Sequence, residues 1–248
     1  MTKQIFIGLA TEGTTDERFL KSLIVRTFEE IALTECVVDI DIFVQSISVG
    51  KSGLSFPEYV VKCSGEGLKR GIMTLAIHTD ADRETYEERI QDKIEPARQL
   101  LNQQADEDYC KLLTPVIPVR MIEAWMLADK ELLKNEIGTR KSDHELKIDR
   151  NPEIIADPKA CIEEAIRIAT SDLPNRRHKL SIADLYEIMG DKISIESTLS
   201  KILCKWKQDS AVSIFLYLDS VFKYKHKLVH NQSPAMNRLC PFLFNLHK

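Results

Sequence analysis

Apolar positions follow two different periods in the first half of the chain. Four short apolar runs have the length of β-strands, at residues 4–10, 38–44, 72–77 and 112–119. Between and after them, apolar side chains recur at the three- and four-residue spacing of a helix face, over residues 14–31, 57–69, 83–104 and 121–133. Strands that alternate with helices predict an α/β, Rossmann-like fold with a largely parallel sheet flanked by helices.

Individual residues refine these elements. Thr14 and Glu17 have the spacing of a capping box, which predicts that the first long helix has its N-cap at Thr14. Polar residues alternate with apolar ones in the run 38–44, as expected for an edge strand with one wetter face. Pro96 predicts a break within the helical region 83–104, since proline cannot donate to the helical ladder.

The pattern changes near Gly138. A polar stretch leads to helical patterns without further strands, at residues 158–170, 181–189, 193–206 and 209–222. We therefore predict an α/β domain at residues 1–137 and a helical C-terminal appendage at residues 138–248 packed on it.

Composition limits the class of protein. The 248 residues can bury a full core without disulfides, and the six cysteines are widely spaced with no CxxC pair. No apolar run is long enough for a membrane helix, and the N-terminus lacks a signal-peptide pattern, so we predict a cytoplasmic protein. The net charge of −4 argues against nucleic-acid binding through bulk charge alone, but it leaves nucleic-acid chemistry open.

Acidic residues follow the predicted strands. Glu12 comes after the first strand, Asp80 and Asp82 after the third, and Glu123 after the fourth. Carboxyl ends of parallel strands meet at one edge of a sheet, and side chains two apart in extended backbone point the same way. Carboxylate oxygens are preferred ligands of Mg²⁺ and Mn²⁺. The sequence therefore predicts a site for one of these cations.

Other residues near these positions allow two interpretations. Asp16 suits the first turn of a helix through the helix dipole, and it is also close enough to join a second metal. Glu123 lies among apolar residues, so its charge needs either a metal or a basic neighbour. His78 is interpreted as a strand residue. The stretch from Gly50 to Gly53 is not a phosphate loop, because Gln45 stands where that motif requires glycine.

Two motifs resemble the Toprim fold of topoisomerases, bacterial primases and overcoming-lysogenization-defect nucleases: the Glu-Gly-x-x-Asp turn at Glu12 and the strand ending in Asp80-x-Asp82. More closely, four segments resemble an uncharacterised bacterial Toprim-like family over nearly the whole chain: residues 12–17, 78–83, 122–129 and 157–159. Members of that family are often encoded beside ATPases of the ABC/AAA type and are associated with phage defence. The resemblance implies a nuclease effector.

On this interpretation the chain is a Mg²⁺- or Mn²⁺-dependent nuclease with Glu12, Asp80 and Asp82 as catalytic metal-site residues. Asp16 and Glu123 would support a second cation. Its partners would be a nucleic acid and an ATPase, while a homodimer is left open. Candidate phosphate contacts are Arg83, Lys159, Arg176 and Arg177.

Two alternatives belong to other classes. One is a non-catalytic Toprim-like subunit that docks on an ATPase. The other is a metal-dependent phosphatase with the first Asp of Asp-x-Asp as a covalent nucleophile. Such phosphatases usually carry the Asp-x-Asp motif on their first strand. Here the motif follows the third strand and the first is followed by Glu12, which disfavours the phosphatase.

Overall fold

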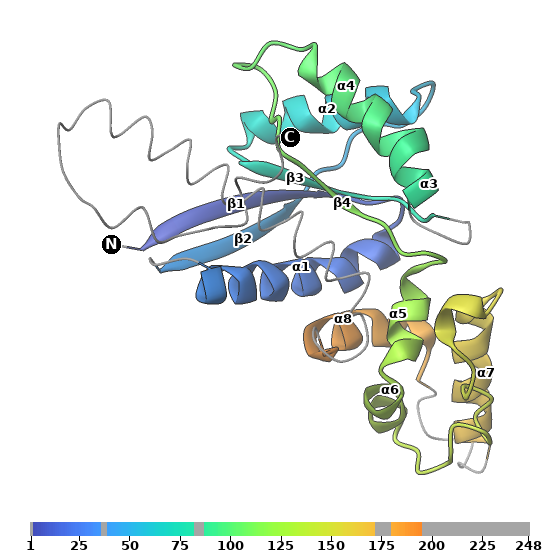
Figure 1. Ribbon diagram of the computed structural model, residues 1–248. Coiled ribbons are helices and arrows are strands. Elements are labelled where there is room, and N and C mark those ends of the chain that lie inside the picture. The colour runs from blue at the N-terminus through green and yellow to red at the C-terminus, as the bar shows by residue number, and fades with distance from the viewer. Residues whose placement is uncertain (1, 36–38, 82–86, 172–179, 195–248) are drawn as a thin grey trace, which may run out of the picture. The chain divides into compact units, whose positions relative to one another are not determined.

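The computed structural model describes residues 2–35, 39–81, 87–171 and 180–194 (Figure 1). The chain divides into two compact units, Met1–Ser213 and Ile214–Lys248, and every described residue belongs to the first unit. No helix in these described ranges has the length and apolar character needed to cross a membrane.

The centre of the first unit is a four-stranded, entirely parallel sheet with the order β2-β1-β3-β4. Its strands are β1 (Lys3–Ala10), β2 (Ile40–Ser46), β3 (Thr74–His78) and β4 (Leu113–Val116). The predicted α/β fold with a parallel sheet is therefore confirmed. The second strand lies at one edge, as its alternating pattern predicted, and β1 and β3 form the buried centre.

Helices cover both faces of the sheet. One face carries α1 (Thr14–Glu35), and the other carries α2 (Phe56–Lys69) and α4 (Glu95–Asn102) (Figure 1). The short α3 (Glu87–Arg89) and a π-helical turn (Ile90–Ile94) lead into α4, whose first turn contains Pro96. The predicted break at Pro96 does not occur, because the backbone stays helical from the π-helical turn into α4 and only the hydrogen-bond pattern changes. The sheet is strongly apolar inside, since Ile7, Leu75 and Ile77 have no exposed surface.

Helix α1 begins one residue earlier than its predicted cap requires. Because the helix starts at Thr14, Gly13 occupies the N-cap position and Asp16 the third helical position. The Gly13 amide donates to Asp16 Oδ2 at 3.0 Å, which is the return half of a capping box. The predicted pairing of Thr14 with Glu17 was wrong, and the Glu17 carboxylate accepts a hydrogen bond from the Ser46 hydroxyl instead.

The remaining described elements are helical. They are α5 (Ile122–Ala128), α6 (Lys130–Ile137), a 3₁₀ turn (Pro152–Ile154), α7 (Pro158–Thr170) and α8 (Ile182–Lys192). The single helix predicted at residues 121–133 is two helices, because Asp129 leaves helical geometry and its side chain caps α6 by accepting from the Leu132 amide at 3.1 Å. The helices predicted at 193–206 and 209–222 lie outside the described residues.

Helix α8 is fixed on α1 by a close backbone approach. A Cβ on Gly190 would lie only 2.3 Å from the Phe19 carbonyl oxygen, so only glycine allows the two helices this separation. Arg26 on α1 donates to the carbonyls of Gly190 at 3.1 Å and Ile193 at 2.7 Å. These bonds satisfy carbonyl groups at the end of α8, which have no partner within the helix.

Candidate acidic site at the sheet edge

The register of β1 and β3 brings the first two acidic segments together. Ala10 pairs with Ile77 in the parallel ladder. Two residues beyond this pair in each segment lie Glu12 and Thr79, and the Thr79 hydroxyl donates to Glu12 Oε1 at 2.9 Å. Thr79 is fully buried and holds the carboxylate of the more exposed Glu12 at the carboxyl edge of the sheet. The predicted meeting of Glu12 with the segment after β3 is therefore observed.

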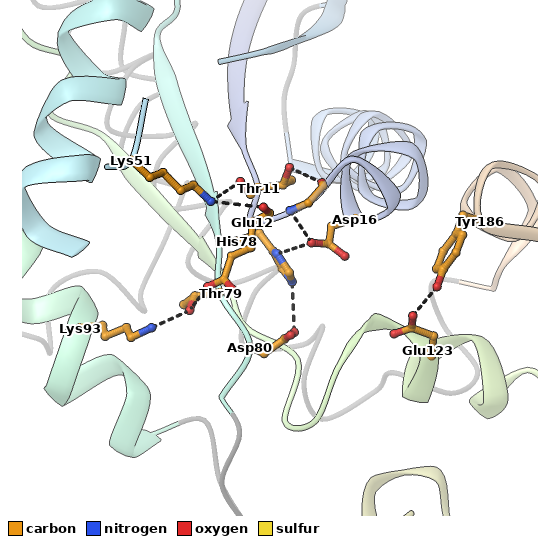
Figure 2. A network of polar contacts seen from close by, with 11 residues as sticks. Thr11, Glu12, Asp16, Lys51, His78, Thr79, Asp80, Lys93, Glu123 and Tyr186 are labelled. Atoms are coloured by element: carbon orange, nitrogen blue, oxygen red, sulfur yellow. Dashed lines mark hydrogen bonds and ion pairs between the residues drawn. The ribbon is translucent and has the colours of Figure 1, made fainter. Parts of the chain in front are cut away.

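His78 lies between two carboxylates (Figure 2). Its side chain is 1% exposed, with Nδ1 3.6 Å from Asp16 Oδ2 and Nε2 3.4 Å from Asp80 Oδ1. Neither contact has hydrogen-bond geometry, so both ring nitrogens are buried without a hydrogen bond among the described residues. Asp16 comes from the first turn of α1 and Asp80 from the segment after β3, and their side chains are 19% and 28% exposed.

Like charges accumulate around Asp16. Burial raises the pKa of its carboxyl above the ordinary value, and His78 lowers that pKa. The Asp80 and Glu12 carboxylates raise it again, while the hydrogen bond from Gly13 acts in the opposite direction. The raised pKa means that this part of the fold disfavours the ionised carboxylate. A bound cation would relieve that penalty.

Two lysines reach the other side of the site. Lys51 Nζ donates to the backbone carbonyls of Thr11 at 3.0 Å and Glu12 at 3.4 Å. Lys93 Nζ donates to the Thr79 hydroxyl at 3.3 Å. Lys51 extends toward the ends of β1 and β3 from the connection before α2, and Lys93 does so from the π-helical turn before α4 (Figure 2). The acidic site therefore has a basic border.

Glu123 has a partner of a different kind. It is 7% exposed on α5, and its Oε1 accepts a hydrogen bond from the hydroxyl of Tyr186, which is 1% exposed on α8. Burial raises the pKa of Tyr186, and the bond to Glu123 and the Asp16 charge raise it further, so the phenol remains a donor. A neutral hydroxyl thus satisfies the buried carboxylate, where a metal or a base was expected. Among the described residues, no hydrogen bond joins Glu123 to Glu12, Asp16 or Asp80.

The described donors have the oxygen chemistry that Mg²⁺ prefers. Oδ1 of Asp80 is buried 3.4 Å from His78 Nε2 and accepts no hydrogen bond from the described residues. Within those residues, however, no three His, Cys, Asp or Glu side chains are close enough together to hold a metal. Asp82, which the sequence pairs with Asp80, lies outside the described ranges.

The predicted phosphate contacts are only partly placed. Lys159 is exposed in the first turn of α7. The other three predicted contacts lie outside the described residues: Arg83, Arg176 and Arg177.

Sequence reasoning missed several residues of the site. His78 stands two positions before Asp80 in extended backbone, and this spacing could have placed both side chains on one face. Lys51 lies in the glycine-flanked stretch that failed the phosphate-loop pattern. Lys93 and Tyr186 had no local signal, because their partners Thr79 and Glu123 are 14 and 63 residues away along the chain.

Comparison with known proteins places these residues in one family. Residues 11–190 match the family described as Domain of unknown function (DUF4276). No curated protein and no solved structure matches the chain. The matched segment starts at the turn that carries Glu12 and ends at Gly190 on α8, so it includes both the acidic site and the helix packed on α1.

Proposed function

The chain belongs to the DUF4276 family, and we propose from the geometry of its site that it is a Mg²⁺- or Mn²⁺-dependent nuclease that hydrolyses phosphodiester bonds. One observation carries the proposal: Glu12, Asp16 and Asp80 gather at the carboxyl edge of β1 and β3, and the pKa of Asp16 is raised there. Ligands of open parallel sheets bind at this edge. The resemblance to Toprim nucleases supports the same reading.

In this proposal, the Asp80 and Asp82 carboxylates hold the cation. Asp16 contributes negative charge from the first turn of α1, 3.6 Å from His78. When bound, a divalent cation would neutralise charge on the scissile phosphate. The buried ring of His78 lies between Asp16 and Asp80.

Glu12 is the proposed base or ligand. Thr79 fixes its Oε1 and leaves the second carboxylate oxygen to orient a water molecule or to complete the metal shell. As the water oxygen bonds to phosphorus, the bond from phosphorus to the leaving oxygen breaks. Glu12 accepts the proton of the water, and the leaving oxygen takes a proton from solvent.

We place this activity in the cytoplasm. Cys63, Cys110 and Cys161 are free thiols, and burial raises the pKa values of Cys63 and Cys110 to about 11, so both remain protonated and unreactive at neutral pH. Free buried thiols are typical of a reducing compartment.

The test compares the purified full-length protein with Asp80→Asn. Labelled single-stranded DNA, duplex DNA and RNA are incubated with Mg²⁺, with Mn²⁺ or with EDTA. We expect cation-dependent cleavage by the unchanged protein and a rate at least about 100-fold lower for D80N. Asp106→Asn is the matched control, because Asp106 follows α4 and its side chain is 91% exposed.

Cleavage that persists in EDTA, or D80N activity equal to that of D106N, would refute the metal site. Absence of cleavage by the unchanged protein under all conditions would instead favour the non-catalytic binding subunit. Circular dichroism of both variants checks that each retains the fold.

A further inference from the structure

Lys51 and Lys93 form a basic border that the proposed chemistry above does not use. We infer that these two lysines each bind a different phosphate of the substrate strand, through a non-bridging oxygen, next to the carboxylates. The inference rests on the proposed function, since it concerns the same site, and it names the side of the site on which the nucleic-acid backbone lies.

The ammonium group of Lys51 is positioned by two backbone carbonyls and one aromatic ring. It lies in the connection between β2 and α2 and reaches the carbonyls of Thr11 and Glu12, where β1 ends. Its Nζ also lies 4.8 Å from the centre of the Tyr59 ring. Carbonyl oxygens and a ring face hold the ammonium group in place without neutralising its charge. A fixed cation with its full charge is what a phosphate ligand requires.

Lys93 has the same kind of support. It extends from the π-helical turn before α4, with Nζ 3.3 Å from the Thr79 hydroxyl and 5.1 Å from the centre of the Phe56 ring. Thr79 in turn donates to Glu12. The two lysines therefore approach the two residues of the Glu12–Thr79 hydrogen bond, one at a backbone carbonyl and one at a hydroxyl (Figure 2).

This arrangement gives the site two sides of opposite charge. Asp16 and Asp80 lie around His78, whereas Lys51 and Lys93 border Glu12 and Thr79. The non-bridging oxygens of a phosphodiester are negatively charged and need positive charge beside them, whereas carboxylates alone would repel them. Lysines already ordered by ring contacts lose less side-chain entropy on binding than free ones do. The basic side therefore suits a phosphate, and the acidic side suits a cation.

The experiment measures binding apart from cleavage. Fluorescein-labelled 20-nucleotide single strands of DNA and RNA, and the DNA duplex, are titrated with the D80N protein in EDTA while anisotropy is followed. Lys51→Gln and Lys93→Gln are then combined in this background. We expect affinity to fall at least about 10-fold, with a salt dependence for single strands that is shallower by about 1.4 in log–log slope, as for two lost phosphate contacts.

The control carries the same loss of charge at the opposite end of the sheet. The control variant combines Lys3→Gln with Lys69→Gln. Lys3 lies at the start of β1, and Lys69 lies at the end of α2, just before the start of β3. Lys51→Arg with Lys93→Arg should restore binding, because arginine keeps the charge, and the unfolding temperature of each variant reports any structural effect.

Equal affinities for the K51Q/K93Q and K3Q/K69Q proteins would overturn the inference, as would an unchanged salt slope or no binding by the D80N parent. If the unchanged protein cuts no substrate but lysine-dependent binding is seen, then the proposed hydrolysis fails and this inference stands.

Discussion

Carboxylates in two parts of the molecule are treated in opposite ways. At the sheet edge, burial raises the pKa of Asp16, and Asp80 and Glu12 add like charge. On α7, hydrogen bonds from Arg167 and Lys147 lower the pKa of Glu164 to about 2. The helical part thus pairs its carboxylates with donors, whereas the sheet edge brings carboxylates together with few of them.

The direction of the pKa shift therefore distinguishes a carboxylate whose ionised form the fold favours, Glu164, from one whose ionised form it disfavours, Asp16. A surface ion pair such as Glu164 with Arg167 is common and contributes little to stability. A carboxylate whose ionisation is disfavoured, such as that of Asp16, must be offset elsewhere, which is typical of functional sites. The contrast therefore supports a ligand at the sheet edge more strongly than any single acidic residue does.

The largest expected effect on stability comes from the donor to the buried Glu123. Tyr186→Phe removes the hydroxyl and leaves a buried carboxylate without its donor, so we expect the free energy of unfolding to fall by about 1–3 kcal/mol. Chemical denaturation measures this change.

Glu123→Gln is the matched variant, because the amide oxygen can still accept from Tyr186 without a buried charge. If Y186F in the E123Q background were as destabilising as Y186F alone, the charge of Glu123 would not be the source of the loss. The helical part would then no longer differ from the sheet edge in how it treats a buried carboxylate.

A smaller and opposite effect is expected at the sheet edge. Since the folded pKa of Asp16 is raised, stability falls as pH rises from the ordinary aspartate value through the folded value, and the penalty persists at neutral pH. Asp16→Asn removes this charge and can still accept from the Gly13 amide. In EDTA at pH 7, we expect Tm to rise by about 2–4 °C.

Addition of Mg²⁺ should then raise the Tm of the unchanged protein more than that of D16N, because the cation offsets the charge that the variant lacks. Differential scanning fluorimetry measures both effects. A lower Tm for D16N in EDTA would show that Asp16 stabilises the fold, as Glu164 does, and would remove the contrast.

The smallest effect is expected for Glu164. Because its folded pKa is lowered, its contribution to stability is present above the ordinary glutamate pKa and disappears as pH falls through about 2. Glu164→Gln should leave the unfolding midpoint at pH 7 almost unchanged, since the side chain is at the surface. An NMR titration of the side-chain carboxyl should give a pKa near 2, and an ordinary value would contradict the pairing.

Local pattern predicted most of the fold. Apolar periodicity located the four strands and the helices between them, and alternation marked β2 as an edge strand, because these features depend on neighbours in sequence. The one-residue error at the start of α1 arose because Glu17 and Asp16 both stand in the first turn, and only the tertiary contact with Ser46 decides between them.

The candidate site was predictable only in part. Chain order brought Glu12 and Asp80 to one edge, but the partners that define their environment come from distant segments. Lys51 and Lys93 reach the site from the β2–α2 connection and the π-helical turn, and Tyr186 reaches Glu123 from α8. No local pattern specifies which of these side chains meet. Nuclease activity, the cation and an ATPase partner remain predictions.

The glycine contact between α8 and α1 sets a minimum size for a fragment that could carry this site. Helix α1 contributes Asp16 near its start and, one to three turns later, the Phe19 and Arg26 surface that receives Gly190 and Ile193. A fragment that stopped after α6 would leave Arg26 without these carbonyls and Glu123 without Tyr186. An expressed fragment intended to retain the site should therefore extend through Ser194, although the last strand among the described residues ends at Val116.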